Sequence, residues 1–128
     1  MSLAITIGRM TQTNNQIRVL FEVTASGNYT TGGDTLNFLT ATYPIGMGPY
    51  FTKPPQFVTM QSQPVGAAGS GYVYGFVGGT TPANGKMQVF QSAGSAAPLA
   101  EIAGAPTAYP AGVLADVISG EAVFDKEV

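Results

Sequence analysis

The chain has 128 residues and a mass of 13.2 kDa, and its five basic and seven acidic residues give a net charge of −2. Because it contains no cysteine and no histidine, it has no disulfide framework, no thiolate metal site and none of the most common general base. Only 9% of the residues are charged, against about 25% in typical soluble domains. The surface must therefore consist largely of neutral polar and apolar groups, and the length predicts one domain spanning residues 1–128.

The distribution of charge and hydropathy argues against nucleic-acid and membrane partners. The basic residues are scattered along the chain, and no two are adjacent. Phosphate backbones are bound by clustered Lys and Arg, which this sequence lacks. No segment approaches the roughly 20 apolar residues that a membrane-spanning helix needs. The first residues also lack the anatomy of a cleaved secretory signal, so we expect a soluble protein that is not exported by one.

Short segments of alternating hydropathy begin at the N-terminus. Leu3, Ile5 and Ile7 share one side of a predicted strand. In residues 17–23, four apolar side chains lie on one side of a predicted strand, and the charged residues Arg18 and Glu22 lie on the other. Residues 1–16 are therefore either an ordinary first strand and loop, or an N-terminal arm that adds a strand to a neighbouring molecule.

The rest of the chain continues in the same way. Further strands are predicted within residues 32–43, 56–63, 71–77, 86–90 and 116–126. Clusters of Gly, Pro, Asn and Ser separate them, and the best helical candidate, residues 97–105, is short and interrupted by glycine. About seven or eight short antiparallel strands joined by long Gly- and Pro-rich loops are typical of an all-β sandwich or barrel.

Residues 71–90 admit two interpretations, a phosphate-binding loop or a β-hairpin. A phosphate loop requires four residues between its glycines and a hydroxyl after Gly-Lys. Here Gly79 precedes Gly85 by one residue too many, and Met87 occupies the hydroxyl position. Both flanks alternate as strands, and Asn84-Gly85 suits the exit from a turn. The pattern predicts a hairpin.

The first arm of this hairpin carries a row of aromatic residues, Tyr72, Tyr74 and Phe76. Because alternate residues of a strand share a face, these three side chains form one contact surface. Such a row stacks sugars or bases in some proteins. More often it is the buried face of a sheet or part of a subunit contact.

No group of residues points to catalysis. Glycoside hydrolysis needs two carboxylates facing each other across a cleft, and the sequence shows no such pair. A nucleophilic serine would lack a histidine or a well-placed lysine partner. We expect a protein that is not an enzyme and that uses no cofactor and no metal.

Residues 43–55 form a long connection in which prolines and glycines alternate with large side chains. Those that look exposed are Met47, Pro49, Tyr50 and Phe51. Long irregular segments in small domains are commonly functional. The loop either folds back over the core of its own chain or packs on a neighbouring subunit.

Three phrases of the sequence, taken together, resemble a known family. They are "TTGGDTLNFL", "GYVYGFVGGTTPANGKMQVF" and "AYPAGVLADVISGEAVFDK", and they extend over roughly residues 30–126. They resemble small structural proteins of tailed-bacteriophage virions, of the capsid decoration or cement type. The resemblance implies a β-sandwich, often jelly-roll-like, that is made in the host cytoplasm. It would sit on the outer surface of the head, commonly as a trimer, and clamp neighbouring major capsid subunits.

The resemblance supplies no catalytic residues, so the site expected is an interface. Its anchors are predicted to be Met47, Pro49, Tyr50 and Phe51, together with Leu3, Ile5 and Ile7 of the N-terminal segment. Two other functions remain open. One is a glycan- or receptor-binding β-sandwich that uses Tyr72, Tyr74 or Tyr109, and the other is a head-fibre or tail component.

Overall fold

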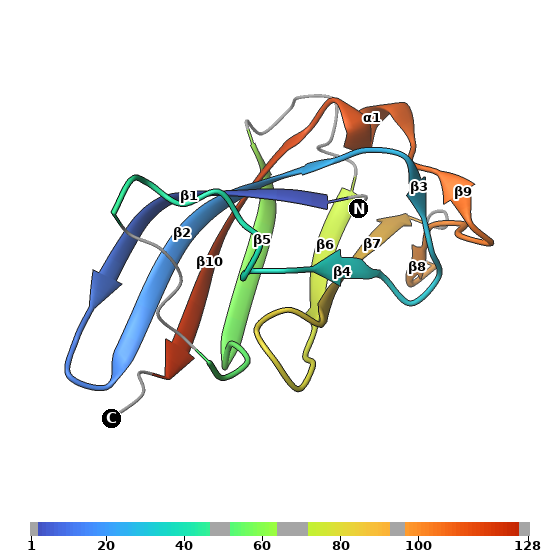
Figure 1. The fold of residues 1–128 in the computed structure, drawn as a ribbon. Coiled ribbons are helices and arrows are strands. Elements are labelled where there is room, and N and C mark those ends of the chain that lie inside the picture. Colours follow the sequence, from blue (N-terminus) through green and yellow to red (C-terminus); the bar gives the residue numbers. More distant parts are fainter. Residues whose placement is uncertain (1–2, 47–51, 64–71, 93–96, 126–128) are drawn as a thin grey trace.

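The computed structural model describes residues 3–46, 52–63, 72–92 and 97–125, and in these ranges the regular secondary structure is almost entirely β (Figure 1). The strands are β1 (Leu3–Gln12), β2 (Gln16–Ala25), β3 (Asn28–Tyr29), β4 (Asp34–Leu36), β5 (Phe57–Gln63), β6 (Tyr72–Val77), β7 (Gly85–Ser92), β8 (Leu99–Glu101), β9 (Thr107–Ala108) and β10 (Val117–Asp125). One helical turn, α1 (Ala111–Leu114), precedes β10. The predicted all-β class is confirmed, with ten strands rather than seven or eight.

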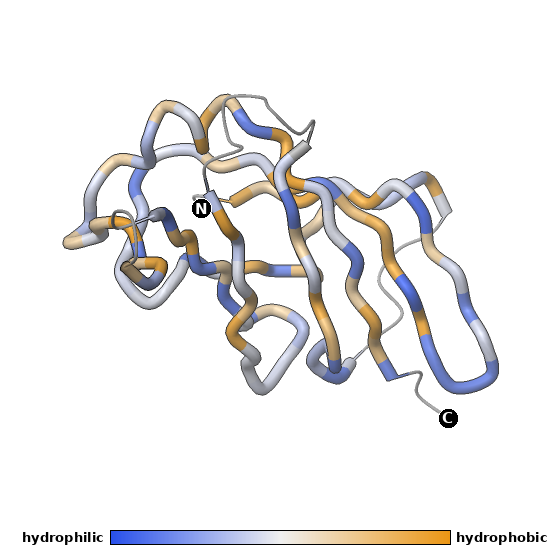
Figure 2. Tube along the Cα trace, turned by 180° about the vertical axis from the view of Figure 1, so that it is seen from behind, coloured by the Kyte–Doolittle hydropathy of each residue, from blue (hydrophilic) through white to orange (hydrophobic). Residues whose placement is uncertain are grey.

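The first sheet has the order β1-β2-β10-β5, and its neighbouring strands are antiparallel. In β2, every second residue from Ile17 to Ala25 is apolar and buried, so one side of this strand faces the core. Figure 2 shows this alternation of hydrophobic and hydrophilic residues along the long strands. A β-bulge at Gly8 shifts the register of β1, so that Arg9 rather than Gly8 pairs with Leu20.

The second sheet is built around β7. β6 pairs antiparallel with β7 from Val77 to Tyr72, which confirms the predicted hairpin. β4 pairs with the first residues of β7 and β8 with the last, so two short strands share one long partner. β3 and β9 form a separate two-stranded ladder.

The two sheets face each other and enclose the core. At one junction β5 and β6 lie side by side (Figure 1). At another, Thr42 bridges to β1, where its N–H donates to Ile5 O at 2.9 Å and its carbonyl accepts from Ile7 N at 2.8 Å. Phe38 is fully buried and makes edge-to-face contacts with Phe21 and Phe124, with ring centroids 5.2 Å and 5.3 Å apart. The sandwich is confirmed, but its strand order does not confirm the jelly-roll connection.

Two segments differ from the sequence-based expectations. The helical candidate, residues 97–105, instead contains β8, because it pairs with the end of β7. The strand predicted within residues 32–43 is limited to β4, since Gly32 and Gly33 adopt positive φ and residues 38–41 form bends. Within the described ranges, no helix has the length and apolar character needed to cross a membrane.

Candidate functional site

The first candidates for chemistry are carboxylates, and the most buried is Asp116, which is 2% exposed. The Tyr74 hydroxyl donates to Asp116 Oδ2 at 2.6 Å, and Ser62 Oγ donates to Asp116 Oδ1 at 2.9 Å. Burial is the main cause that raises the pKa of Tyr74, and its hydrogen bond to Asp116 adds to the effect. The tyrosine therefore stays a neutral donor, and both oxygens of Asp116 are occupied within the fold.

Two further tyrosines are held by carboxylates at the end of the sandwich where β3, β4, β8 and β9 meet. Tyr29 OH donates to Glu101 Oε2 at 2.5 Å, and the same oxygen accepts from Gly32 N at 2.7 Å. Tyr109 OH donates to Asp34 Oδ2. Burial, reinforced by these hydrogen bonds, raises the pKa of both tyrosines. These pairs connect strands that are distant in sequence, and their role is structural.

The described residues offer no arrangement suited to a metal. Within residues 3–46, 52–63, 72–92 and 97–125, no three His, Cys, Asp or Glu side chains come together as a metal site would require. In the same ranges, every buried side-chain nitrogen or oxygen has a hydrogen-bond partner. The remaining candidates for a functional site are therefore the outer surfaces of the two sheets.

The predicted aromatic row is part of the inner face of the second sheet. Tyr74 is buried, and Tyr72 and Phe76 pack against the core while remaining partly exposed. Of the two interpretations of this row, the buried face is the one found. Tyr109 is also buried, at 3% exposure. The expectation that Tyr74 or Tyr109 contacts a glycan is therefore corrected, because these rings are covered by their own chain.

The predicted interface anchors fall into two groups, one that the structure describes and one that it does not. Leu3, Ile5 and Ile7 are 3–5% exposed and belong to the core of their own chain. They were expected at an intermolecular contact, and this expectation is corrected because β1 pairs with β2 and turns its apolar side inward. The other anchors, Met47, Pro49, Tyr50 and Phe51, lie outside the described residues.

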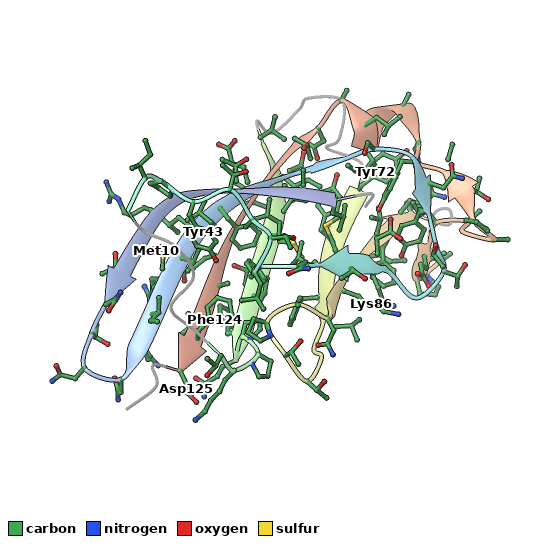
Figure 3. The ribbon with its side chains drawn as sticks, in the orientation of Figure 1. Met10, Tyr43, Tyr72, Lys86, Phe124 and Asp125 are labelled. Carbon is green, nitrogen blue, oxygen red and sulfur yellow. The ribbon has the colours of Figure 1, made fainter. Side chains whose placement is uncertain are left out.

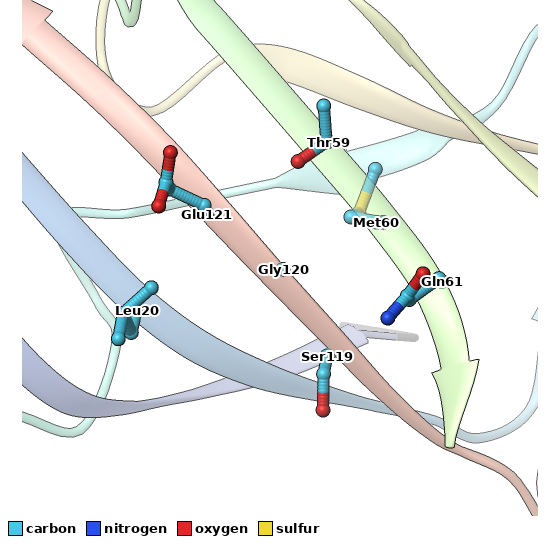
Figure 4. A pocket seen from close by; sticks show the side chains of 7 residues that line it. All are labelled: Leu20, Thr59, Met60, Gln61, Ser119, Gly120 and Glu121. Carbon is cyan, nitrogen blue, oxygen red and sulfur yellow. The ribbon is translucent and has the colours of Figure 1, made fainter. Parts of the chain in front are cut away.

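The outer face of the first sheet contains two adjoining shallow depressions. Both are bordered by Leu20 of β2 and by Ser119 and Gly120 of β10. The first extends over β5, where its remaining lining residues are Thr59, Met60, Gln61 and, from β10, Glu121 (Figure 4). The second extends toward β1 and is completed by Thr6, Gly8, Phe21 and Glu22. Ser119, which shares this face with Glu22 and has a small side chain, leaves this part of the sheet surface low.

Charged side chains surround Leu20 on this face. Arg18 and Glu22 are two residues away along β2, so they point to the same side as Leu20. Arg9 pairs with Leu20 from β1, and Glu121 pairs with it from β10. Within the chain, Arg18 Nε lies 3.9 Å from Glu121 Oε1, with 57% of the arginine side chain exposed. A pair this long and exposed contributes little to stability.

Part of the outer face of the second sheet is apolar. Val73, Val77 and Leu99 are 48%, 40% and 54% exposed. Phe90 pairs with Val73, and its ring lies over Gly75, whose Cβ position would be 3.4 Å from Phe90 Cε2. We call these four side chains, Val73, Val77, Phe90 and Leu99, the apolar patch.

Lys86 projects outward from β7 at one end of the apolar patch, opposite Val77 (Figure 3). Sequence reasoning missed the patch because it assigned the face of Val73 and Val77 no role. A signal for the outer face of the first sheet was present, since Leu20 is an apolar residue on the otherwise polar side of β2.

Comparisons with known proteins gave no match: no family model, no curated protein and no solved structure is significantly similar to this chain.

Proposed function

We propose that the chain is a non-enzymatic structural protein of a tailed-phage virion, which decorates the outside of the head and stabilises it by clamping neighbouring major capsid subunits. The observation that favours this function most is the apolar patch. Contiguous exposed apolar side chains on a soluble domain mark a contact surface. Here they lie on paired strands of the second sheet, so the surface is formed before any partner binds.

The low charge of the chain supports the same role. Because only 9% of the residues are charged, much of the surface can be buried against a partner without leaving many unpaired charges desolvated. A head presents the same binding site many times, so an oligomeric decoration protein gains avidity from several weak contacts. The clamp therefore does not require one large interface on each subunit.

The test is a binding assay with expanded heads that lack this chain. Purified protein is mixed with the heads, sedimented, and quantified against the major capsid protein. We expect saturable binding at a fixed ratio. Val73→Asp combined with Leu99→Asp places carboxylates in the patch and is expected to abolish co-sedimentation, since a desolvated unpaired charge opposes burial.

The matched control is Leu39→Asp. Leu39 is 43% exposed, comparable with Leu99, but it lies outside the patch. This variant should bind like the wild type, and circular dichroism should show all three proteins folded. Equal loss of binding in both variants would contradict the assignment of the patch. A wild-type protein that does not bind heads, together with a signal on a glycan array, would contradict the decoration function itself.

A further inference from the structure

The outer face of the first sheet has an arrangement of charge that is complementary to itself. Arg9 and Arg18 lie on one side of a diagonal through Leu20, and Glu22 and Glu121 lie on the other. We call them the basic pair and the acidic pair. At the centre, Leu20 is 41% exposed. The remaining acid at the end of this face, Asp125, accepts a hydrogen bond from Gln56 Nε2 at 2.9 Å.

Each depression on this face has one carboxylate in its lining. Glu121 contributes to the depression over β5, and Glu22 contributes to the one toward β1. The other polar lining groups are neutral hydroxyls and an amide from Ser119, Thr6, Thr59 and Gln61. Such a lining accepts hydrogen bonds from a cation with several donors, and the guanidinium group, with five N–H donors, fits that chemistry.

We propose that this face binds the same face of a second copy of the chain, in a dimer with two-fold symmetry. The axis runs parallel to the sheet, above its outer face, in the direction of the diagonal that passes over Leu20. Rotation about it turns the second copy face to face and places its basic pair over the acidic pair of the first. Each Arg18 then meets the Glu121 of the other copy, and each Arg9 meets its Glu22. Such an isologous contact uses one surface patch twice.

The face offers enough area for a small contact. Four strands spaced about 4.8 Å apart, with up to ten residues rising about 3.3 Å each, present roughly 600 Å² on each copy. Because the diagonal axis makes the strands of the two copies cross, the faces overlap only in part, and the dimer belongs with the small interfaces that bury less than about 1,200 Å². The central contact is apolar, between the two Leu20 side chains, and the charge pairs surround it. The inference does not rest on the proposed function.

The test measures the mass of the full chain in solution by light scattering and sedimentation velocity, with the wild type and two charge variants. The acidic-face variant combines Arg9→Glu with Arg18→Glu, and the basic-face variant combines Glu22→Arg with Glu121→Arg. The wild type is expected at twice 13.2 kDa. In each variant alone like charges meet, which should weaken the dimer by about a hundredfold or more. An equimolar mixture of the two should restore a dimer containing one copy of each.

Lys86→Glu is the matched control, because it reverses a charge on the outer face of the second sheet and should remain dimeric. Thermal unfolding establishes that each variant is folded. If a variant does not fold, the wild type still tests the proposal: its dimer dissociation constant should increase at least tenfold at high salt, which screens charges beyond about 3 Å at 1 M. A wild-type monomer or trimer, dimeric single variants, a mixture that stays monomeric, or a dissociation constant independent of salt would each overturn the proposal.

Discussion

Tyr74 and Asp116, which are 42 residues apart in the chain, are joined by a hydrogen bond of 2.6 Å from the tyrosine hydroxyl to the buried carboxylate. Tyr74 belongs to β6 of the second sheet, and Asp116 directly precedes β10 of the first. The bond therefore connects the two sheets. Ser62 of β5 donates to the other carboxylate oxygen, which explains how a charged group is accommodated in the core.

Tyr74→Phe should destabilise the protein by about 1–3 kcal/mol, because it leaves one buried oxygen of Asp116 without its donor. Urea unfolding followed by circular dichroism measures the change. The slope of the unfolding free energy against urea concentration should be the same as in the wild type. Tyr72→Phe is the control, since Tyr72 lies on the same face of β6 but is only partly buried. If both variants unfold at the wild-type midpoint, the bond to Asp116 does not stabilise the fold.

A second prediction concerns Gly120, where the backbone of β10 is in close contact with neighbouring groups. A Cβ atom at this position would lie 2.6 Å from Phe21 Cζ and 2.6 Å from the carbonyl oxygen of Thr59. Gly120→Ala should therefore destabilise the protein by about 1–3 kcal/mol through steric strain in the packed core.

Gly78→Ala is the matched control for Gly120→Ala, because no heavy atom lies within 4 Å of its Cβ position. We expect a change close to zero there, or slight stabilisation from reduced freedom of the unfolded chain. Thermal unfolding compares the two. Similar melting temperatures for both variants would contradict the packing of Phe21 over Gly120.

The sequence was sufficient to predict the long strands, because their alternation records which side is buried. In β2, Ile17, Val19 and Phe21 occupy every second position, and the structure buries each of the three. The hairpin of β6 and β7 was predictable for the same reason, aided by turn chemistry between its arms. A hydropathy pattern therefore predicts structure best where the paired strands follow each other in the chain.

The short strands and the tyrosine–carboxylate pairs could not be predicted in this way. β8 and β9 contain three and two residues, too few to show a period, and they exist because distant segments pair with them. Tyr29 and Glu101 are 72 residues apart, so nothing in the neighbourhood of either one indicates the other. The inward direction of Tyr74 likewise depends on which face of β6 the first sheet covers.

Alkaline pH supplies a further prediction, because the pKa values of four tyrosines are raised above their ordinary value of about 10. Burial is the largest cause in each of Tyr29, Tyr43, Tyr74 and Tyr109. A raised pKa means that the folded state favours the neutral phenol. The stability associated with it is fully present below pH 10, the pKa in the unfolded chain, and decreases as the pH rises above that value.

The measurement is a parallel titration of tyrosinate absorbance and far-ultraviolet circular dichroism. The phenolate signal of these four residues should appear only as the protein unfolds, so the two curves should share one cooperative transition above pH 10. In concentrated guanidinium chloride all six tyrosines should ionise near pH 10, which calibrates the full amplitude. Full phenolate amplitude near pH 10 with native circular dichroism would show that these four hydroxyls are accessible to solvent in the folded protein. The hydrogen bonds of Tyr29, Tyr74 and Tyr109 to their carboxylates would then not hold the sheets together.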